Sequence, residues 1–262
     1  MQLDQSTIAA LAEHLENAEL NVQAVSKITD RHPDMDWEDA YAIQDVIRAR
    51  KQARGIPVSD LKMGLTSRGK MEQMGVKEPI YGFLNGRHRY QTGAVIDTAA
   101  LIHPKVEAEI GFVLKRPLKG PGCHIGEVLA ATDYVVATVE VIDSRYENFR
   151  FDLKSVIADN TSAARYVVGD TYRQVAGLDL RNLGIVLRKN GEVATVASGA
   201  AVLGHPAASV AMLANMLGAR GREIPAGVLI MTGGATEAVA VGKGDRVAVE
   251  FQWLGSVTME FA

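Results

Sequence analysis

Cysteine is nearly absent from this chain of 262 residues: Cys123 stands alone, which excludes an internal disulfide bond and the disulfide-rich class of small proteins. There is no excess of basic residues, because 28 Lys and Arg are scattered among 31 Asp and Glu, and we therefore expect no nucleic acid partner. We find no apolar run of roughly 18 residues and no basic leader followed by an apolar stretch. We therefore predict neither a membrane span nor a signal peptide.

The composition that remains is that of an ordinary globular protein. Hydrophobic residues make up 47% of the chain and charged residues 23%, which excludes a disordered chain. The length suits one large domain or two small ones, and either can bury a core. The lone cysteine fits a reducing compartment, so we expect a soluble cytoplasmic protein.

Helical patterns fill the first 55 residues. Ser6 is expected to cap the first helix, and Asp36 is expected to cap a second helix that ends at Gly55. The residues at helical spacing are Ile8, Leu11, Ala12 and Leu15 in the first helix and Ala40, Ile43, Val46 and Ile47 in the second.

After residue 55 the pattern changes to short strands, interrupted by predicted helices at about 125–132 and 206–219. Asn190-Gly191 lies between two strand-like runs and is a strong hairpin signal, and Leu254-Gly255 marks a second hairpin. Because strands outnumber helices and do not alternate regularly with them, we predict an α+β protein with a mostly-β core and appended helices. The predicted strands cover 95–97, 106–115, 135–142, 184–187, 192–196, 228–231, 247–253 and 256–261.

Two carboxylates are spaced to share one face of a strand. Glu107 and Glu109 are two residues apart in the strand-like run 106–115, and such residues point to the same side of a sheet. A solvated strand face is the alternative, since glutamate is usually exposed.

A third glutamate favours the functional interpretation. Alternation in 135–142 places Glu140 on one face with Val136, Thr138 and Ile142, and so apolar a run predicts that Glu140 is buried. A buried carboxylate needs a partner charge or a metal. Three acidic oxygen ligands without histidine or cysteine suit Mg²⁺ or Mn²⁺. If the two strands are adjacent, Glu107, Glu109 and Glu140 form a metal site.

Lys62 lies between apolar neighbours, two residues before Gly64. The glycine indicates close approach of the backbone, and a partly buried lysine can bind an oxyanion or donate a proton. A solvated surface lysine remains the alternative.

Weaker signals surround polar residues elsewhere. Arg145 follows the Glu140 strand and is a candidate to clamp a substrate carboxylate. Ser162 ends a polar segment, 159–162, that is either a turn or a hydroxyl cluster for an anion. Thr232 precedes a glycine pair whose backbone N–H groups are expected to face a ligand.

Several short motifs are weak signals when taken one at a time, but together they occur in a specific order and spacing. They are Lys62-Met-Gly-Leu65-Thr66, Lys105 to Glu109, Val139 to Val141 with Asp143-Ser-Arg145, Ala158-Asp-Asn160, Met74-Gly-Val76, and Glu78-Pro-Ile80-Tyr-Gly-Phe-Leu84. Over nearly the whole chain this set resembles the fumarylacetoacetase-related hydratase/decarboxylase family.

The resemblance implies a mixed β-roll or sandwich core in a catalytic domain, 76–262, after a mainly helical lobe, 1–75. It implies a metal held by Glu107, Glu109 and Glu140, with Lys62 in the active site and no organic cofactor. It also implies that Leu65, Ile80, Arg145, Ser162 and Thr232 are placed near a small dicarboxylate substrate.

The implied reaction is metal-dependent decarboxylation of 2-oxohex-3-enedioate to 2-hydroxypenta-2,4-dienoate and CO₂, in meta-cleavage degradation of aromatic compounds. The alternative is the sister activity, hydration of 2-hydroxypenta-2,4-dienoate. In the hydratases an Asp stands where this chain has Ile80, and isoleucine has no titratable group for acid/base work. The difference favours the decarboxylase, and the resemblance further implies a complex with the sister hydratase and a possible homo-oligomer.

Overall fold

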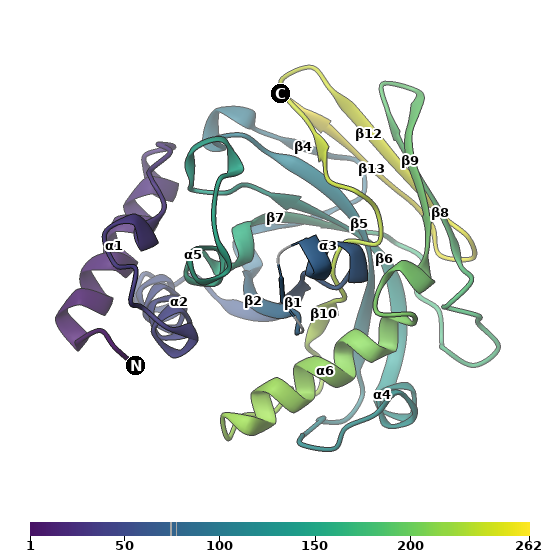
Figure 1. The fold of residues 1–262 in the computed structure, drawn as a ribbon. Coiled ribbons are helices and arrows are strands. Elements are labelled where there is room, and N and C mark those ends of the chain that lie inside the picture. Colours follow the sequence, from purple (N-terminus) through teal and green to yellow (C-terminus); the bar gives the residue numbers. More distant parts are fainter. Residues whose placement is uncertain (74, 77) are drawn as a thin grey trace.

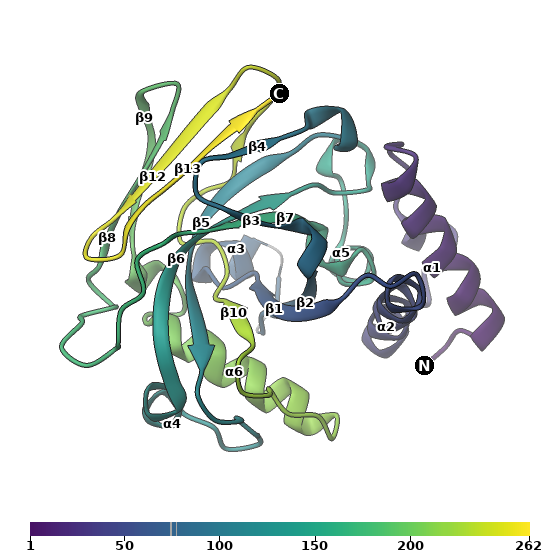
Figure 2. The same cartoon turned by 180° about the vertical axis from the view of Figure 1, so that it is seen from behind.

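The computed structural model describes residues 1–73, 75–76 and 78–262, so Met74, in one motif of the resemblance, lies outside the described residues. Two strongly curved sheets lie side by side, with two N-terminal helices at the end of the molecule remote from the second sheet (Figures 1 and 2). This arrangement confirms the predicted α+β class.

The first two helices form where the apolar spacing predicts them. Helix α1 (Gln5–Leu20) begins after Asp4, whose side chain accepts from the Thr7 N–H, so the prediction of Ser6 as the cap is wrong. The carboxylate of Asp4 precedes Ser6 and already satisfies a free N–H of the first turn. Helix α2 (Trp37–Ala53) is capped by Asp36 as predicted, and every predicted inward residue is buried except the half-buried Val46.

The remaining elements follow the helical N-terminus. The longer helices are α3 (Arg68–Gln73), α4 (Ile125–Ala131), α5 (Leu153–Ala158) and α6 (Pro206–Ala219). The strands are β1 (Val58–Gly64), β2 (Ile80–Asn85), β3 (Arg89–Gln91), β4 (Ala94–Ile96), β5 (Lys105–Leu114), β6 (Thr132–Ile142), β7 (Ala163–Val168), β8 (Gly184–Lys189), β9 (Glu192–Ser198), β10 (Leu229–Met231), β11 (Val239–Ala240), β12 (Arg246–Phe251) and β13 (Gly255–Phe261).

The first sheet has the order β2-β1-β10-β5-β6-β7-β3, with β11 paired to β5, and the second has the order β4-β13-β12-β8-β9. Both predicted hairpins are confirmed in the second sheet. At the β8–β9 turn Asn190 and Gly191 have φ values of 54° and 88°, the left-handed pair that a two-residue hairpin turn requires. Strands β1, β2, β3, β7 and β11 and helices α3 and α5 were not predicted.

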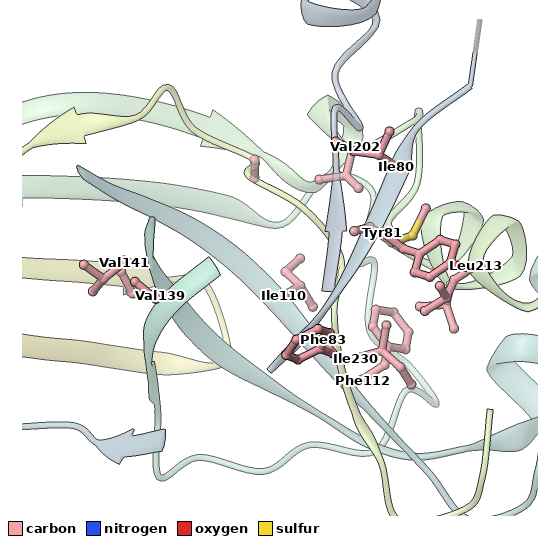
Figure 3. Close-up of a cluster of buried hydrophobic side chains, with 14 of the residues drawn as sticks. Ile80, Tyr81, Phe83, Ile110, Phe112, Val139, Val141, Val202, Leu213 and Ile230 are labelled. Carbon is pink, nitrogen blue, oxygen red and sulfur yellow. The ribbon is translucent and has the colours of Figure 1, made fainter. Parts of the chain in front are cut away.

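Strand β6 shows why the first sheet is buried on both sides. Val135, Ala137, Val139 and Val141 pack into the larger core, part of which Figure 3 shows, whereas Val136 faces a second apolar cluster. The predicted alternation is therefore confirmed, and it places Glu140 on the Val136 face.

Strand β1 pairs with β2 and β10 in the first sheet although it precedes residue 75. The helical part ends at Ala53, so the division into lobes 1–75 and 76–262 remains a proposal.

One segment of the described chain is long and apolar enough to cross a membrane, by length and composition alone. Residues 199–219 have a mean hydropathy of 1.4, and half of that window is buried inside the protein. The apolar side of α6 in this window, including Val210, Leu213 and Leu217, belongs to the core, and core helices commonly pass such a test.

Candidate active site

Strand pairing brings three carboxylates together. Strands β5 and β6 are antiparallel neighbours, and Glu107 lies directly opposite Glu140. Glu109 is two residues further along β5, on the same face. Ligand oxygens of the three residues lie within 4.8 Å of one another, which confirms the strand adjacency that the sequence interpretation assumed.

These carboxylates are removed from solvent. Glu109 and Glu140 are 0% exposed and Glu107 is 8% exposed. Burial and then the charge of Glu140 raise the pKa of Glu109 well above its ordinary value, and burial likewise raises the pKa of Glu140. Carboxylate oxygens that are buried this close together need a compensating positive charge when they are ionised.

The hydrogen bonds of the carboxylates leave capacity for a ligand. Glu109 Oε2 accepts from the Gly233 N–H at 2.7 Å, whereas Oε1 of Glu109 and Oε1 of Glu140 accept from none of the described residues. Buried, unsatisfied and purely oxygen donors fit a hard divalent cation.

Lys62 lies beside the carboxylates and not on the surface. It is 3% exposed on β1, and its Nζ is 2.7 Å from Glu140 Oε2 and 3.0 Å from the Thr161 carbonyl, to which it donates. Strands β1 and β6 are separated by β10 and β5, so this ion pair exists because the sheet curls strongly.

The Thr161 carbonyl belongs to a strained turn. Asn160, Thr161 and Ser162 all have left-handed φ values, 50°, 53° and 58°. The Asn160 side chain accepts from the Phe83 N–H and donates to the Phe83 carbonyl, each at 2.9 Å, and so ties the turn to β2. A Cβ at Gly82 would lie 2.5 Å from Thr161 Oγ1, so only glycine allows this approach. Strain of this kind persists where the surroundings fix it, commonly at functional sites.

A cavity of about 440 Å³ opens beside these groups. Four of the predicted residues besides Glu107 line it: Lys62, Leu65, Ile80 and Ser162. Ser162 Oγ is buried and has no hydrogen-bond partner among the described residues. The other lining residues are Gly64, Lys105, Ile142, Phe149, Phe151, Val156, Thr161 and Ala238.

Arg145 lies elsewhere. It pairs with Asp159, donates to the carbonyls of Asp143, Asp159 and Ala163, and is 3% exposed. Because the protein itself occupies the guanidinium, Arg145 holds the chain after β6 in place, and the predicted carboxylate clamp is corrected to a structural role.

Thr232 and the glycine pair also differ from the prediction. Thr232 is 0% exposed and donates to the Ile110 carbonyl, so it does not line the cavity. The N–H of Gly233 faces the Glu109 carboxylate and not a ligand directly. A Cβ at Gly234 would lie 2.6 Å from Glu107 Oε2, so the glycines let this loop close over the carboxylates.

The sequence analysis missed Lys105, Phe149, Phe151 and Thr161 as cavity residues. Strand alternation alone places Lys105 on the face of Glu107, so that signal was available. The other three lie in irregular segments between β6 and β7, where no periodicity indicates direction.

Residues 65–262 match the family described as fumarylacetoacetate (FAA) hydrolase C-terminal. A 4-oxalocrotonate decarboxylase of Pseudomonas sp. (strain CF600) is 61% identical, over 99% of this chain and 98% of that protein. The solved 4-oxalocrotonate decarboxylase from Pseudomonas putida G7, complexed with magnesium and adipate, is 57% identical with a TM-score of 0.98, covering 100% of this chain and 99% of that one. A 2-hydroxyhexa-2,4-dienoate hydratase of Comamonas testosteroni is 36% identical, over 98% of each chain.

Proposed function

The chain belongs to the fumarylacetoacetate hydrolase C-terminal family, and from this we infer that it is a decarboxylase of 4-oxalocrotonate, 2-oxohex-3-enedioate. The products are 2-hydroxypenta-2,4-dienoate and CO₂, as in meta-cleavage degradation of aromatic compounds. The observation that carries this proposal is the contact of the Lys62 ammonium with a buried cluster of three glutamates beside one cavity.

Glu107, Glu109 and Glu140 would hold the metal, and their oxygen donors favour Mg²⁺ or Mn²⁺. Such a cation supplies Lewis-acid stabilisation of negative charge on the 2-oxo oxygen of the substrate. The site needs no organic cofactor, because a metal and an ammonium together stabilise an oxyanion.

Lys62 acts on the same oxygen. When the distal carboxylate leaves as CO₂, its electron pair delocalises through the alkene onto the 2-oxo oxygen. Two of the three ammonium protons of Lys62 are directed at Glu140 and the Thr161 carbonyl, and the third donates to that oxygen. Because the metal would supply the electron sink, the reaction needs no imine at Lys62.

The cavity wall favours loss of charge at the far end of the substrate. Ile80 is 2% exposed and, like Val156 and Phe151, is an apolar residue that lines the cavity. A departing carboxylate becomes neutral CO₂, so a poorly solvated wall opposes the reactant charge and not the product. Leu65 adds apolar surface, and Ser162 Oγ is free to donate to a substrate carboxylate.

The second candidate is the sister hydratase activity, since hydratases of this family are also similar to the chain. Ile80 disfavours it, because hydration requires a titratable group near the far carbons of the dienoate.

We further propose that the enzyme is cytoplasmic and passes its unstable dienol to the sister hydratase within a complex. The charge balance and the scattered basic residues give no reason to expect nucleic acid as a partner. A possible homo-oligomer belongs to the same proposal, and co-purification of the two enzymes measures the complex.

The function is tested with purified protein, 4-oxalocrotonate and Mg²⁺, by measuring CO₂ release and dienol absorbance together. We expect both to appear in equal amounts and to stop when a chelator removes the metal. Hydration of 2-hydroxypenta-2,4-dienoate faster than decarboxylation of the diacid would overturn the assignment.

A further inference from the structure

Lys105 is a second cation in the cavity, and the reaction described above does not use it. It is the first residue of β5, two before Glu107 and on the same face of the strand. Its Nζ lies 4.1 Å from the centroid of the Phe149 ring, and both residues line the cavity. Within the described part of the chain, Lys105 forms no ion pair with a carboxylate.

The Phe149 ring beneath the Lys105 ammonium is held in place by its backbone conformation and by neighbouring rings. Asn148 and Phe149 have φ values of 55° and 56°, and this left-handed pair turns the Phe149 ring toward Lys105. The His103 and Phe151 rings pack against Phe149 with centroids 4.7 and 6.3 Å away. The aromatic face holds the ammonium by a cation–π contact without neutralising its charge.

Lys105 differs from Lys62 because it has no carboxylate partner among the described residues. Lys62 is paired with Glu140, and the three glutamates are the candidate ligands of a divalent cation. A dicarboxylate carries a second negative charge at its distal end, and Lys105 is the other lysine among the described residues that line the cavity. Two strand residues span about 6.6 Å, a separation comparable to the length of an extended six-carbon diacid.

We propose that Lys105 binds the distal carboxylate of the substrate and selects dicarboxylic 2-oxo acids over monocarboxylic 2-oxo acids of equal length. This inference rests on the proposed function, because it assigns the proximal end of the substrate to the metal and Lys62. The contact belongs to the ground state, since the distal carboxylate loses its charge as CO₂ departs. Lys105 therefore lowers KM and, because it stabilises the substrate more than the transition state, also lowers kcat.

The binding experiment uses 2-oxoadipate and 2-oxohexanoate, which differ in the distal carboxylate and lack the alkene that decarboxylation requires. Titration calorimetry in Mg²⁺ compares the wild type with Lys105→Met, Lys105→Arg and, as a matched loss of charge, Lys115→Met at the exposed residue that follows β5. We expect Lys105→Met to weaken 2-oxoadipate binding about 10- to 100-fold and to leave 2-oxohexanoate binding unchanged. Lys105→Arg and Lys115→Met should both keep the wild-type preference.

Turnover of 4-oxalocrotonate by the same proteins gives the second measurement. Lys105→Met should raise KM and kcat together, so that kcat/KM changes much less than KM. A parallel weakening of both ligands, or no change in either, would overturn the role of Lys105. If the wild type prefers the diacid but releases no CO₂ from 4-oxalocrotonate, only the proposed function is contradicted.

Discussion

At the scale of single residues, the carboxylate cluster is costly without a cation. Glu109 is fully buried, accepts one backbone hydrogen bond and lies beside two other glutamates. Glu109→Gln replaces the carboxyl group by an amide of nearly the same shape and so removes one ionisable charge. We therefore expect the metal-free variant to be as stable as wild type or more stable, by about 1 kcal/mol.

Metal binding should show the opposite effect in the same variant. A cation at 100 times its dissociation constant stabilises a folded protein by about 2.7 kcal/mol, and Glu109→Gln should lose most of this gain. Thermal unfolding with chelator and with Mg²⁺ measures both quantities, with Glu250→Gln, at an exposed position of β12, as the control. An unchanged response to Mg²⁺ would show that the cluster is not the metal site.

Lys62 is expected to act by hydrogen bonding to the substrate oxygen. Lys62→Met should lower kcat by about 10²- to 10³-fold, the typical loss for one donor to a developing oxyanion. Borohydride added during turnover should leave the mass of the wild-type protein unchanged. A trapped adduct at Lys62 would establish an imine and contradict this mechanism.

Ile80 is expected to separate this enzyme from its hydratase relatives. Ile80→Asp places a negative charge in a poorly solvated wall and opposes the distal carboxylate, at a cost of a few kcal/mol, roughly. Decarboxylation should fall sharply, as measured by CO₂ release alongside an assay for dienoate hydration. If decarboxylation is unaffected, residue 80 does not contact the substrate and the discrimination argument fails.

At the scale of elements, the turn 160–162 positions the catalytic lysine. The Asn160 amide replaces a missing strand partner for Phe83, and the next residue supplies the carbonyl that accepts from Lys62. Asn160→Ala leaves both Phe83 groups unpaired and keeps an unfavourable φ, so it should lower the free energy of unfolding by about 2–4 kcal/mol. Denaturant unfolding measures this loss.

Asn160→Gly is the matched control for that variant. It removes the same two hydrogen bonds but tolerates φ of 50°. It should therefore be less destabilised than Asn160→Ala by about 1 kcal/mol. Equal losses in the two variants would show that backbone strain contributes nothing at this turn.

At the scale of the whole molecule, His88 makes stability depend on pH. Its Nδ1 lies 2.9 Å from Asn85 Nδ2 and 3.0 Å from Arg165 Nη1, and both are donors, so Nδ1 must stay unprotonated. Burial and then Arg165 lower the pKa of His88 to about 4. Between pH 6.5 and pH 4 the unfolded chain therefore binds a proton that the folded chain does not bind. The contribution of His88 to stability is complete above pH 6.5 and is lost as the pH falls toward 4.

His88→Gln keeps an acceptor for both donors and removes the titration. Between pH 7 and pH 5 the wild type should lose about 1–2 kcal/mol of unfolding free energy relative to this variant. The comparison between variants is necessary because burial raises the pKa of Glu109 and Glu140, and those groups act in the opposite direction. Parallel pH profiles from urea unfolding would contradict the assignment to His88.

The sequence by itself determined the features that depend on local periodicity and turn chemistry. Period-2 alternation placed Glu140 on the correct face of β6, and the same rule put Glu107 and Glu109 together on β5. The Asp36 cap and the Asn190-Gly191 turn could also be predicted from the sequence, since each depends on a few adjacent residues.

Only the tertiary structure decided which distant groups meet. The curl of the sheet carries Lys62 from β1 to Glu140 on β6, and the pairing of Arg145 with Asp159 removes that arginine from the cavity. The left-handed turn at Thr161 is stable because β2 holds it, and no local pattern encodes that support. Contacts such as these depend on how strands far apart in the chain pack, so composition and spacing leave them open.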